Sequence, residues 1–175
     1  MNSFKDLKRN LNLNNKNRIL FGVVPMILTP RWFFASIQKE IEKAGGLRLA
    51  KEVYYRAGFK SAYKYCRTQR RAKRLIGTET IREYLDSMSI RGWGRFKIIQ
   101  LNEEKGRGVF RLYHSALAEE YGPKGRAVCH WVPGAMAGAI QEAIHTQRLP
   151  LEVKGKEQKC KAKGYQYCEF VVFPK

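Results

Sequence analysis

The feature that most restricts the fold of this chain is a pair of cysteines placed evenly about a glycine near the C-terminus. Cys160 and Cys168 lie four residues before and after Gly164, and a Lys-Gly pair at the centre favours a turn. If the turn is centred there, the two residues become cross-strand neighbours with Cβ atoms about 4.5–5.5 Å apart. Two thiolates on one tetrahedral zinc lie about 3.8 Å apart, so a hairpin can present both to one ion.

Two further residues complete a candidate metal site. Cys129 stands just before a segment rich in small residues, 134–144. Glu157 lies three residues before Cys160, an odd spacing that places it on the opposite face of a regular strand, so it requires a bend near Lys159. Three thiolates and one carboxylate leave no position for water, which is typical of a structural zinc ion.

The cysteine count leaves other interpretations open. Four cysteines in 175 residues are too few for a disulfide scaffold. In a reducing compartment, a cluster of three with an acid favours metal, but a Cys160–Cys168 disulfide or two unrelated thiols also fit the spacing. Cys66 stands apart in a helical stretch and is interpreted as a buried, inert thiol.

Hydrophobic periodicity predicts the order of the secondary structure. The apolar run 19–28 is too short to span a bilayer and has no signal-peptide cleavage site after it, so we predict a buried strand and a cytoplasmic protein. Helices are expected from Thr29-Pro30 to about residue 44, then over 49–74, 78–91 and 134–144; strands are expected over 95–101, over 108–114 and in a hairpin over 149–173. The prediction is an α+β fold with an antiparallel sheet packed against helices, organised as one domain over residues 31–175 after an arm and first strand over 1–30.

The charge of the chain suggests a second kind of partner. Its 34 basic and 15 acidic residues give a formal net charge of +19, which attracts nucleic acid, anionic lipid or an acidic protein. The cations are densest at Arg67–Arg74 and Lys154–Lys163. A solvated helix face explains such runs equally well, and no nucleic-acid-binding motif accompanies them. A basic adaptor that binds nucleic acid or an acidic partner is therefore an alternative function.

The segments VCHWVPGAMAGAI and KEQKCKAKGYQYCEF (128–140 and 156–170) resemble the 4-vinyl reductase or hydrocarbon-binding domain family. This family includes the sensory domains of phenol-responsive activators and a bacteriochlorophyll-biosynthesis accessory protein, and a weaker likeness extends back to about residue 32. The resemblance implies the α/β ligand-binding fold of TRAPP transport-particle subunits and haem nitric-oxide sensors, in a homodimer. It also implies a zinc ion held by Cys129, Glu157, Cys160 and Cys168.

The resulting hypothesis is a zinc-containing sensor or accessory domain that binds a small hydrocarbon or aromatic ligand in an apolar pocket. Candidate lining residues are Trp32, Phe33, Tyr54, Trp93, Phe110, Tyr113, His114 and Trp131. Phenol recognition is not carried over, because Ala116 follows Ser115 where the phenol sensors have a tryptophan. A further alternative is an accessory protein or enzyme of vinyl-group reduction in tetrapyrrole metabolism, but the sequence has no dinucleotide-binding loop or catalytic triad, so an enzyme is the less favoured interpretation.

Overall fold

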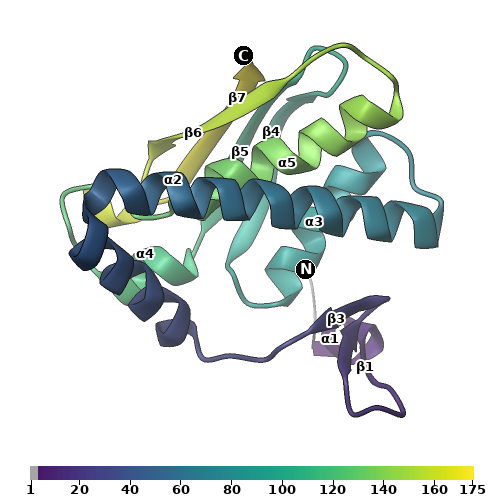
Figure 1. Ribbon diagram of the computed structural model, residues 1–175, viewed down its shortest axis with the longest axis horizontal. Helices are drawn as coiled ribbons and strands as arrows, with labels where there is room; N and C mark the ends of the chain where they lie inside the picture. Colours follow the sequence, from purple (N-terminus) through teal and green to yellow (C-terminus); the bar gives the residue numbers. More distant parts are fainter. Residues whose placement is uncertain (1–3) are drawn as a thin grey trace.

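The computed structural model describes residues 4–175 and has an α+β architecture (Figure 1). Its main sheet has four antiparallel strands in the order β4-β5-β7-β6. These strands are β4 (Arg95–Asn102), β5 (Arg107–Tyr113), β6 (Val153–Lys159) and β7 (Cys168–Pro174). The predicted antiparallel sheet packed against helices is confirmed, with strand bounds within a few residues of those expected.

Helices cover one face of this sheet in two layers. Helix α5 (Trp131–Thr146) lies directly on the sheet, and every residue from Val132 to Ile144 is buried. Helix α2 (Arg31–Lys73) crosses outside α5, while α3 (Thr78–Ile90) and α4 (Ala116–Tyr121) close the ends of the layer (Figure 1). The core therefore lies between the sheet, α5 and α2.

The predicted break between two helices at Gly45-Gly46 appears as a kink inside α2. Gly46 has φ 77° and ψ 167°, a conformation that costs a residue without a Cβ atom little. At the start of α2, Pro30 takes the N-cap position that the sequence assigned to Thr29. The cause is the extended backbone of Pro30 (ψ 146°), which delays the first helical residue to Arg31.

Three glycines allow α2 and α5 to pack with their backbones almost in contact. A Cβ atom added at Gly58 would lie 2.2 Å from the carbonyl oxygen of Trp131. Added at Gly134 or Gly138, it would lie 2.0 or 2.3 Å from a carbonyl oxygen of α2. These small residues therefore allow the axes of α2 and α5 to approach closely.

The N-terminal region differs from the prediction of a polar arm and a single buried strand. Residues 4–26 form α1 (Phe4–Asn10) and a three-stranded antiparallel sheet of β1 (Leu11–Leu13), β2 (Ile19–Phe21) and β3 (Val24–Met26). The run 19–28 is wrong as one strand because Gly22, at φ 59°, turns the chain back between β2 and β3. Residues 1–3 of the expected arm lie outside the described part. Within residues 4–175, no helix is long and apolar enough to cross a membrane.

Candidate metal centre and aromatic cavity

The four predicted metal ligands meet where the C-terminal hairpin approaches the start of α5. Cys160 directly follows β6, and Cys168 opens β7 after a turn in which Gly164 has φ 100°. Glu157 pairs with Phe170 and Lys159 with Glu169, so one extra residue bulges from β6 between them. This irregularity is the bend that the sequence required to bring Glu157 to the side of the cysteines.

The ligand atoms of the cluster have the spacing of a single coordination sphere. One atom from each of Cys129, Glu157, Cys160 and Cys168 lies within 4.8 Å of the others. The Sγ atoms of Cys129 and Cys168 are 3.7 Å apart, and those of Cys160 and Cys168 are 3.9 Å apart. These distances match the edge of about 3.8 Å expected for thiolates on a tetrahedral zinc, and far exceed an S–S bond. All four cysteines of the chain are free thiols, so the Cys160–Cys168 disulfide is not formed.

Burial and crowding perturb the acid groups of this cluster. Burial, followed by the proximity of Cys160, raises the pKa of Glu157 to about 9. Hydrogen bonds with Cys160 and Cys168 raise the pKa of the Cys129 thiol, while the same kind of bonds from Cys129 and Cys160 lower the pKa of Cys168. Four acidic groups packed in a buried site favour occupation by a cation over four separate negative charges.

Two backbone amides donate hydrogen bonds to the cluster, and one carboxylate oxygen of the cluster has no partner among the described residues. The amide of Cys129 donates to Oε2 of Glu157 at 3.2 Å, and the amide of Lys161 donates to Sγ of Cys168 at 3.3 Å. Oε1 of Glu157 is buried without a hydrogen-bond partner among the described residues. A buried acceptor of this kind is costly unless something pairs with it, so the donor set and the unpaired oxygen both fit a divalent cation.

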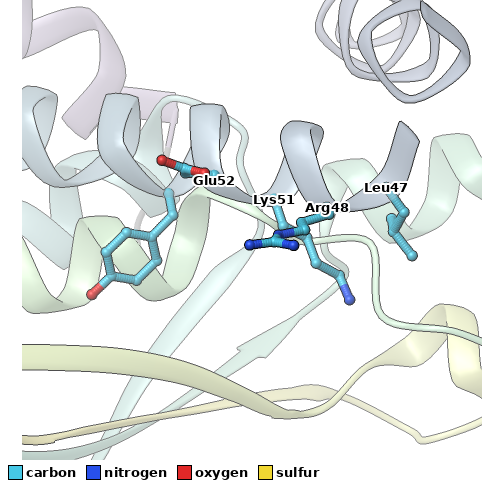
Figure 2. A pocket seen from close by; sticks show the side chains of 5 residues that line it. Leu47, Arg48, Lys51 and Glu52 are labelled. Carbon is cyan, nitrogen blue, oxygen red and sulfur yellow. The ribbon is translucent and has the colours of Figure 1, made fainter. Parts of the chain in front are cut away.

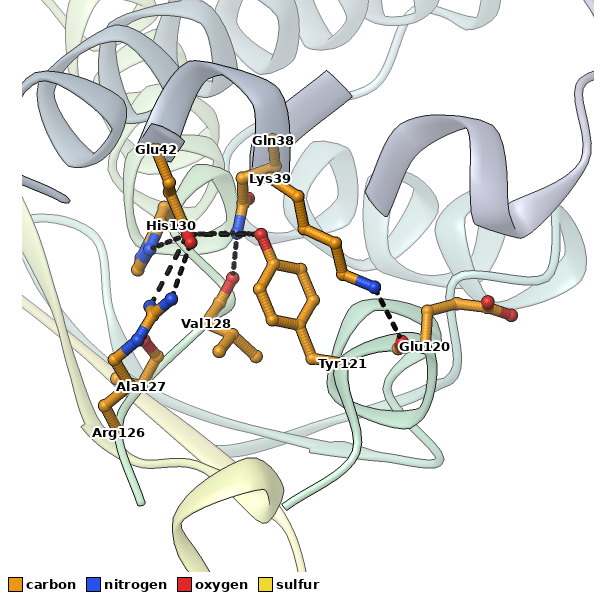
Figure 3. Close-up of polar contacts among 9 residues, drawn as sticks. All are labelled: Gln38, Lys39, Glu42, Glu120, Tyr121, Arg126, Ala127, Val128 and His130. Atoms are coloured by element: carbon orange, nitrogen blue, oxygen red, sulfur yellow. Dashed lines mark hydrogen bonds and ion pairs between the residues drawn. The ribbon is translucent and has the colours of Figure 1, made fainter. Parts of the chain in front are cut away.

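A polar network adjoins the cluster and ties it to α2 (Figure 3). Glu42 accepts hydrogen bonds from Arg126 at 2.5 Å, Tyr121 at 3.1 Å and His130 Nε2 at 3.1 Å. Gln38, also on α2, donates to the carbonyl oxygen of Val128 at 2.8 Å. Burial alone would raise the pKa of Glu42, but the hydrogen bonds and charge of Arg126 hold it below its usual value. The residues on both sides of Cys129 are thereby fixed to α2.

An aromatic cavity of about 180 Å³ lies between α2, α3 and the start of α5. Trp93 forms one wall, with its ring centroid 4.9 Å from Phe34 and 4.6 Å from Trp131. The remaining lining residues are Tyr54, Ala57, Gly58, Ser61, Tyr65, Tyr84, Met88 and Arg91. Because Trp131 follows Cys129 by two residues, the metal cluster and the cavity wall share one short segment.

The structure brings together three of the eight residues proposed to line a pocket: Tyr54, Trp93 and Trp131. Phe110 is fully buried in the core against the sheet, away from this cavity. Trp32 and Phe33 point outward, 60% and 44% exposed. Tyr113 packs against Tyr167, and the His114 side chain is 74% exposed beside Glu119.

Several lining residues were missed by sequence reasoning, namely Phe34, Tyr65, Tyr84, Met88 and Arg91. Tyr84 and Met88 lie on the buried face of α3, four residues apart. Arg91 lies three residues after Met88, so it continues that face, and the spacing was the signal that could have found it.

A separate surface groove of about 710 Å³ runs along α2, lined by Leu47, Arg48, Lys51, Glu52 and Tyr55. Figure 2 shows the side chains of Arg48 and Lys51 close together in it. The cations of the groove contribute to the basic surface. Its lining includes one aromatic residue, Tyr55, whereas several aromatic side chains line the cavity.

The basic run Arg67–Arg74 forms the C-terminal end of α2. Part of it is used inside the protein, because Arg70 pairs with Glu142 at 2.8 Å and Lys73 pairs with Glu83. Arg67, Arg71 and Arg74 remain exposed. The run thus presents fewer free cations than its sequence suggests.

Two solved structures share this fold. The phenol-responsive sensory domain of the transcription activator PoxR, solved with phenol, is 20% identical, with a TM-score of 0.79 over 97% of this chain and 87% of that one. A vinyl-4-reductase family protein from Methanocaldococcus jannaschii is 13% identical, with a TM-score of 0.55 over 86% of this chain and 84% of its own.

The fold predicted from the resemblance also recurs in more distant proteins. A trafficking protein particle complex subunit 3 from Naegleria fowleri, covalently bound to palmitic acid, is 12% identical, with a TM-score of 0.54 over 83% of this chain and 95% of its own. An H-NOX protein from S. oneidensis is 12% identical, with a TM-score of 0.52 over 98% of this chain and 88% of its own. At these identities the likeness establishes the shared fold.

Family profiles cover both halves of the chain. Residues 10–99 match the family described as a domain of unknown function (DUF5943), and residues 109–174 match the 4-vinyl reductase domain. No curated protein matches the sequence. The second match contains all four residues of the candidate metal centre, as the resemblance implied. The chain therefore belongs to the DUF5943 family and carries a 4-vinyl reductase domain over its C-terminal part.

Proposed function

We propose that this protein is a sensor or accessory domain that binds a small hydrocarbon or aromatic molecule in the cavity between α2, α3 and α5. The observation that carries this proposal is the cavity of about 180 Å³ walled by Trp93, Trp131 and tyrosines. An apolar cavity of about 150 Å³ is large enough to hold benzene. The PoxR sensory domain, which shares the fold, was solved with phenol, and this supports the same kind of use here.

In this proposal one structural zinc ion is held by Cys129, Glu157, Cys160 and Cys168. The spacing of the sulfurs and the unpaired buried oxygen of Glu157 support it. A zinc ion would supply no reaction here, because four protein ligands leave no vacant position. Its effect would be to fix Cys129, and through it Trp131, against the terminal hairpin.

The same proposal assigns both sites to one binding domain over residues 31–175, in a homodimer from a reducing compartment such as the cytoplasm. Three unoxidised thiols within one cluster suit that compartment. Exposed apolar side chains at the start of α2, Trp32, Phe33 and Ile37, support an interface between copies. Light scattering tests the dimer, and a particle of 20.3 kDa would contradict it.

The experiment that tests ligand binding uses intrinsic fluorescence, because two of the three tryptophans line the cavity. Small aromatic compounds should change this fluorescence saturably and displace an apolar fluorescent probe. A matched control is Ile99→Ala, which removes an exposed apolar side chain outside both the cavity and the proposed interface. If no compound in a broad aromatic and aliphatic panel binds saturably, the proposal is wrong.

A further inference from the structure

We infer that the preferred ligand of the cavity is a one-ring aromatic carboxylate whose acidic group pairs with Arg91. This inference rests on the proposed function, since it requires that the cavity be the ligand site. It adds the chemical class of the ligand, which follows from the charges and hydrogen-bonding groups around the cavity.

Arg91 is a half-buried cation without an acidic partner. Four arginines within residues 4–175 are half-buried. Three of them pair with carboxylates: Arg70 with Glu142, Arg111 with Glu169 and Arg126 with Glu42. Arg91 has no ion pair in the described chain. A guanidinium taken partly out of water and left without an anion is an unfavourable arrangement that a bound anion would relieve.

The contacts that Arg91 does make leave its charge unbalanced. Its Nε donates to the carbonyl oxygen of Ser87 at 3.1 Å. Its two terminal nitrogens face the thioether sulfurs of Met26 and Met88, which are weak acceptors. The guanidinium also lies 4.9 Å from the ring centroid of Tyr65. These contacts hold the side chain in position but provide no negative charge. Each terminal nitrogen has two N–H groups and uses one on a sulfur, which leaves one on each nitrogen for a carboxylate in the paired geometry that guanidinium favours.

The rest of the lining specifies an aromatic ring. Arg91 is the only charged residue among those that line the cavity, and no aspartate or glutamate is among them. Trp93 and Trp131 offer flat apolar walls at an interplanar angle of 60°. The indole Nε1–H of Trp131 is buried without an acceptor in the described chain. A cavity of about 180 Å³ leaves room for one ring and a small acidic group.

The test compares benzoate with benzyl alcohol, a neutral compound of the same size, by calorimetric titration. Wild-type protein should bind benzoate at least about tenfold more tightly, because a charge-assisted hydrogen bond contributes that much or more. Measurements at about 1 M sodium chloride, where the Debye length is about 3 Å, remove the general attraction of a basic surface for anions. The preference should persist there if it comes from the cavity.

Arg91→Gln should abolish the preference, so that the affinities of the variant for benzoate and benzyl alcohol lie within about twofold of each other. The matched control is Arg82→Gln, which removes an exposed charge from the same helix and should change neither affinity. Arg91 also contacts Met26 of the N-terminal sheet, so its substitution can disturb folding. The comparison of benzoate with benzyl alcohol on wild-type protein at high salt therefore tests the inference without a variant.

Each outcome has a distinct meaning. A wild-type protein that binds benzyl alcohol as well as benzoate at high salt overturns this inference and leaves the proposed function intact. An Arg91→Gln variant that folds and keeps the preference for benzoate also overturns it. If neither benzoate, benzyl alcohol nor any compound of the broad panel binds saturably, the proposed function itself is wrong.

Discussion

Adding one methyl group at the α2–α5 contact should destabilise the protein measurably. In Gly138→Ala the new Cβ atom would lie 2.3 Å from the carbonyl oxygen and 3.0 Å from the carbonyl carbon of Phe59. The distance of 2.3 Å to the oxygen is about 0.7 Å shorter than 3.0 Å, the limit below which Cβ contacts essentially do not occur. The obstacle is backbone within a helix, which cannot rotate away as a side chain can. The two helices must therefore separate.

We expect this separation to lower the free energy of unfolding by about 1–3 kcal/mol, the usual cost of overpacking, after the small gain in helix propensity. Urea denaturation measures the loss as a lower midpoint at an unchanged slope. In a domain of this size the melting temperature should fall by roughly 2–4 °C for each kcal/mol.

Gly45→Ala is the matched control for this experiment. The three heavy atoms nearest to its Cβ atom would all belong to the side chain of Leu49, which is 47% exposed and can move. The control should therefore be neutral or stabilised by up to about 1 kcal/mol. If Gly138→Ala is as stable as Gly45→Ala, the close backbone contact between α2 and α5 is not as described.

Two further predictions concern the metal centre and its neighbouring network. Cys160→Ser should lose stoichiometric zinc by elemental analysis and lower the melting temperature far more than Cys66→Ser; equal small losses would argue against the metal centre. Glu42→Gln should cost about 1–3 kcal/mol at neutral pH, because it weakens the bond to Arg126. Since folding lowers the pKa of Glu42 from 4.5, its ionised form stabilises the protein fully above that pH. The wild-type advantage over Glu42→Gln should therefore shrink as the pH falls through the folded pKa, and a constant difference from pH 7 to 3 would refute this.

Features that depend on a few neighbouring residues, such as turns and helix ends, were predicted well from the sequence. The turn at Gly164 and the end of α3 before Gly92 follow from the conformational freedom of glycine. The four residues of the candidate metal centre were recognisable because their residue types are rare together. Strand parity alone would have rejected Glu157, since a bulge is not visible in a hydrophobic pattern.

Features that depend on tertiary structure, such as the residues that line the cavity, were predicted less well. The run 19–28 was wrong as one strand because a short apolar run does not show where the chain turns back. Trp32, Phe33 and Phe34 are consecutive, and residues on a helix point about 100° apart, so they cannot all face one cavity. Of the three, only Phe34 lines the cavity, and it is next to the buried residue Ala35. Residue type alone does not distinguish a cavity wall from core, as Phe110 illustrates.

The segment from Val128 to Trp131 joins the candidate metal centre to the cavity wall. Four consecutive residues make four different contacts: the Val128 carbonyl accepts from α2, Cys129 joins the cysteine cluster, His130 bonds Glu42, and Trp131 forms the cavity wall. Such a segment cannot shift at one residue without straining the others. A ligand that displaces Trp131 must therefore act on the backbone that carries Cys129.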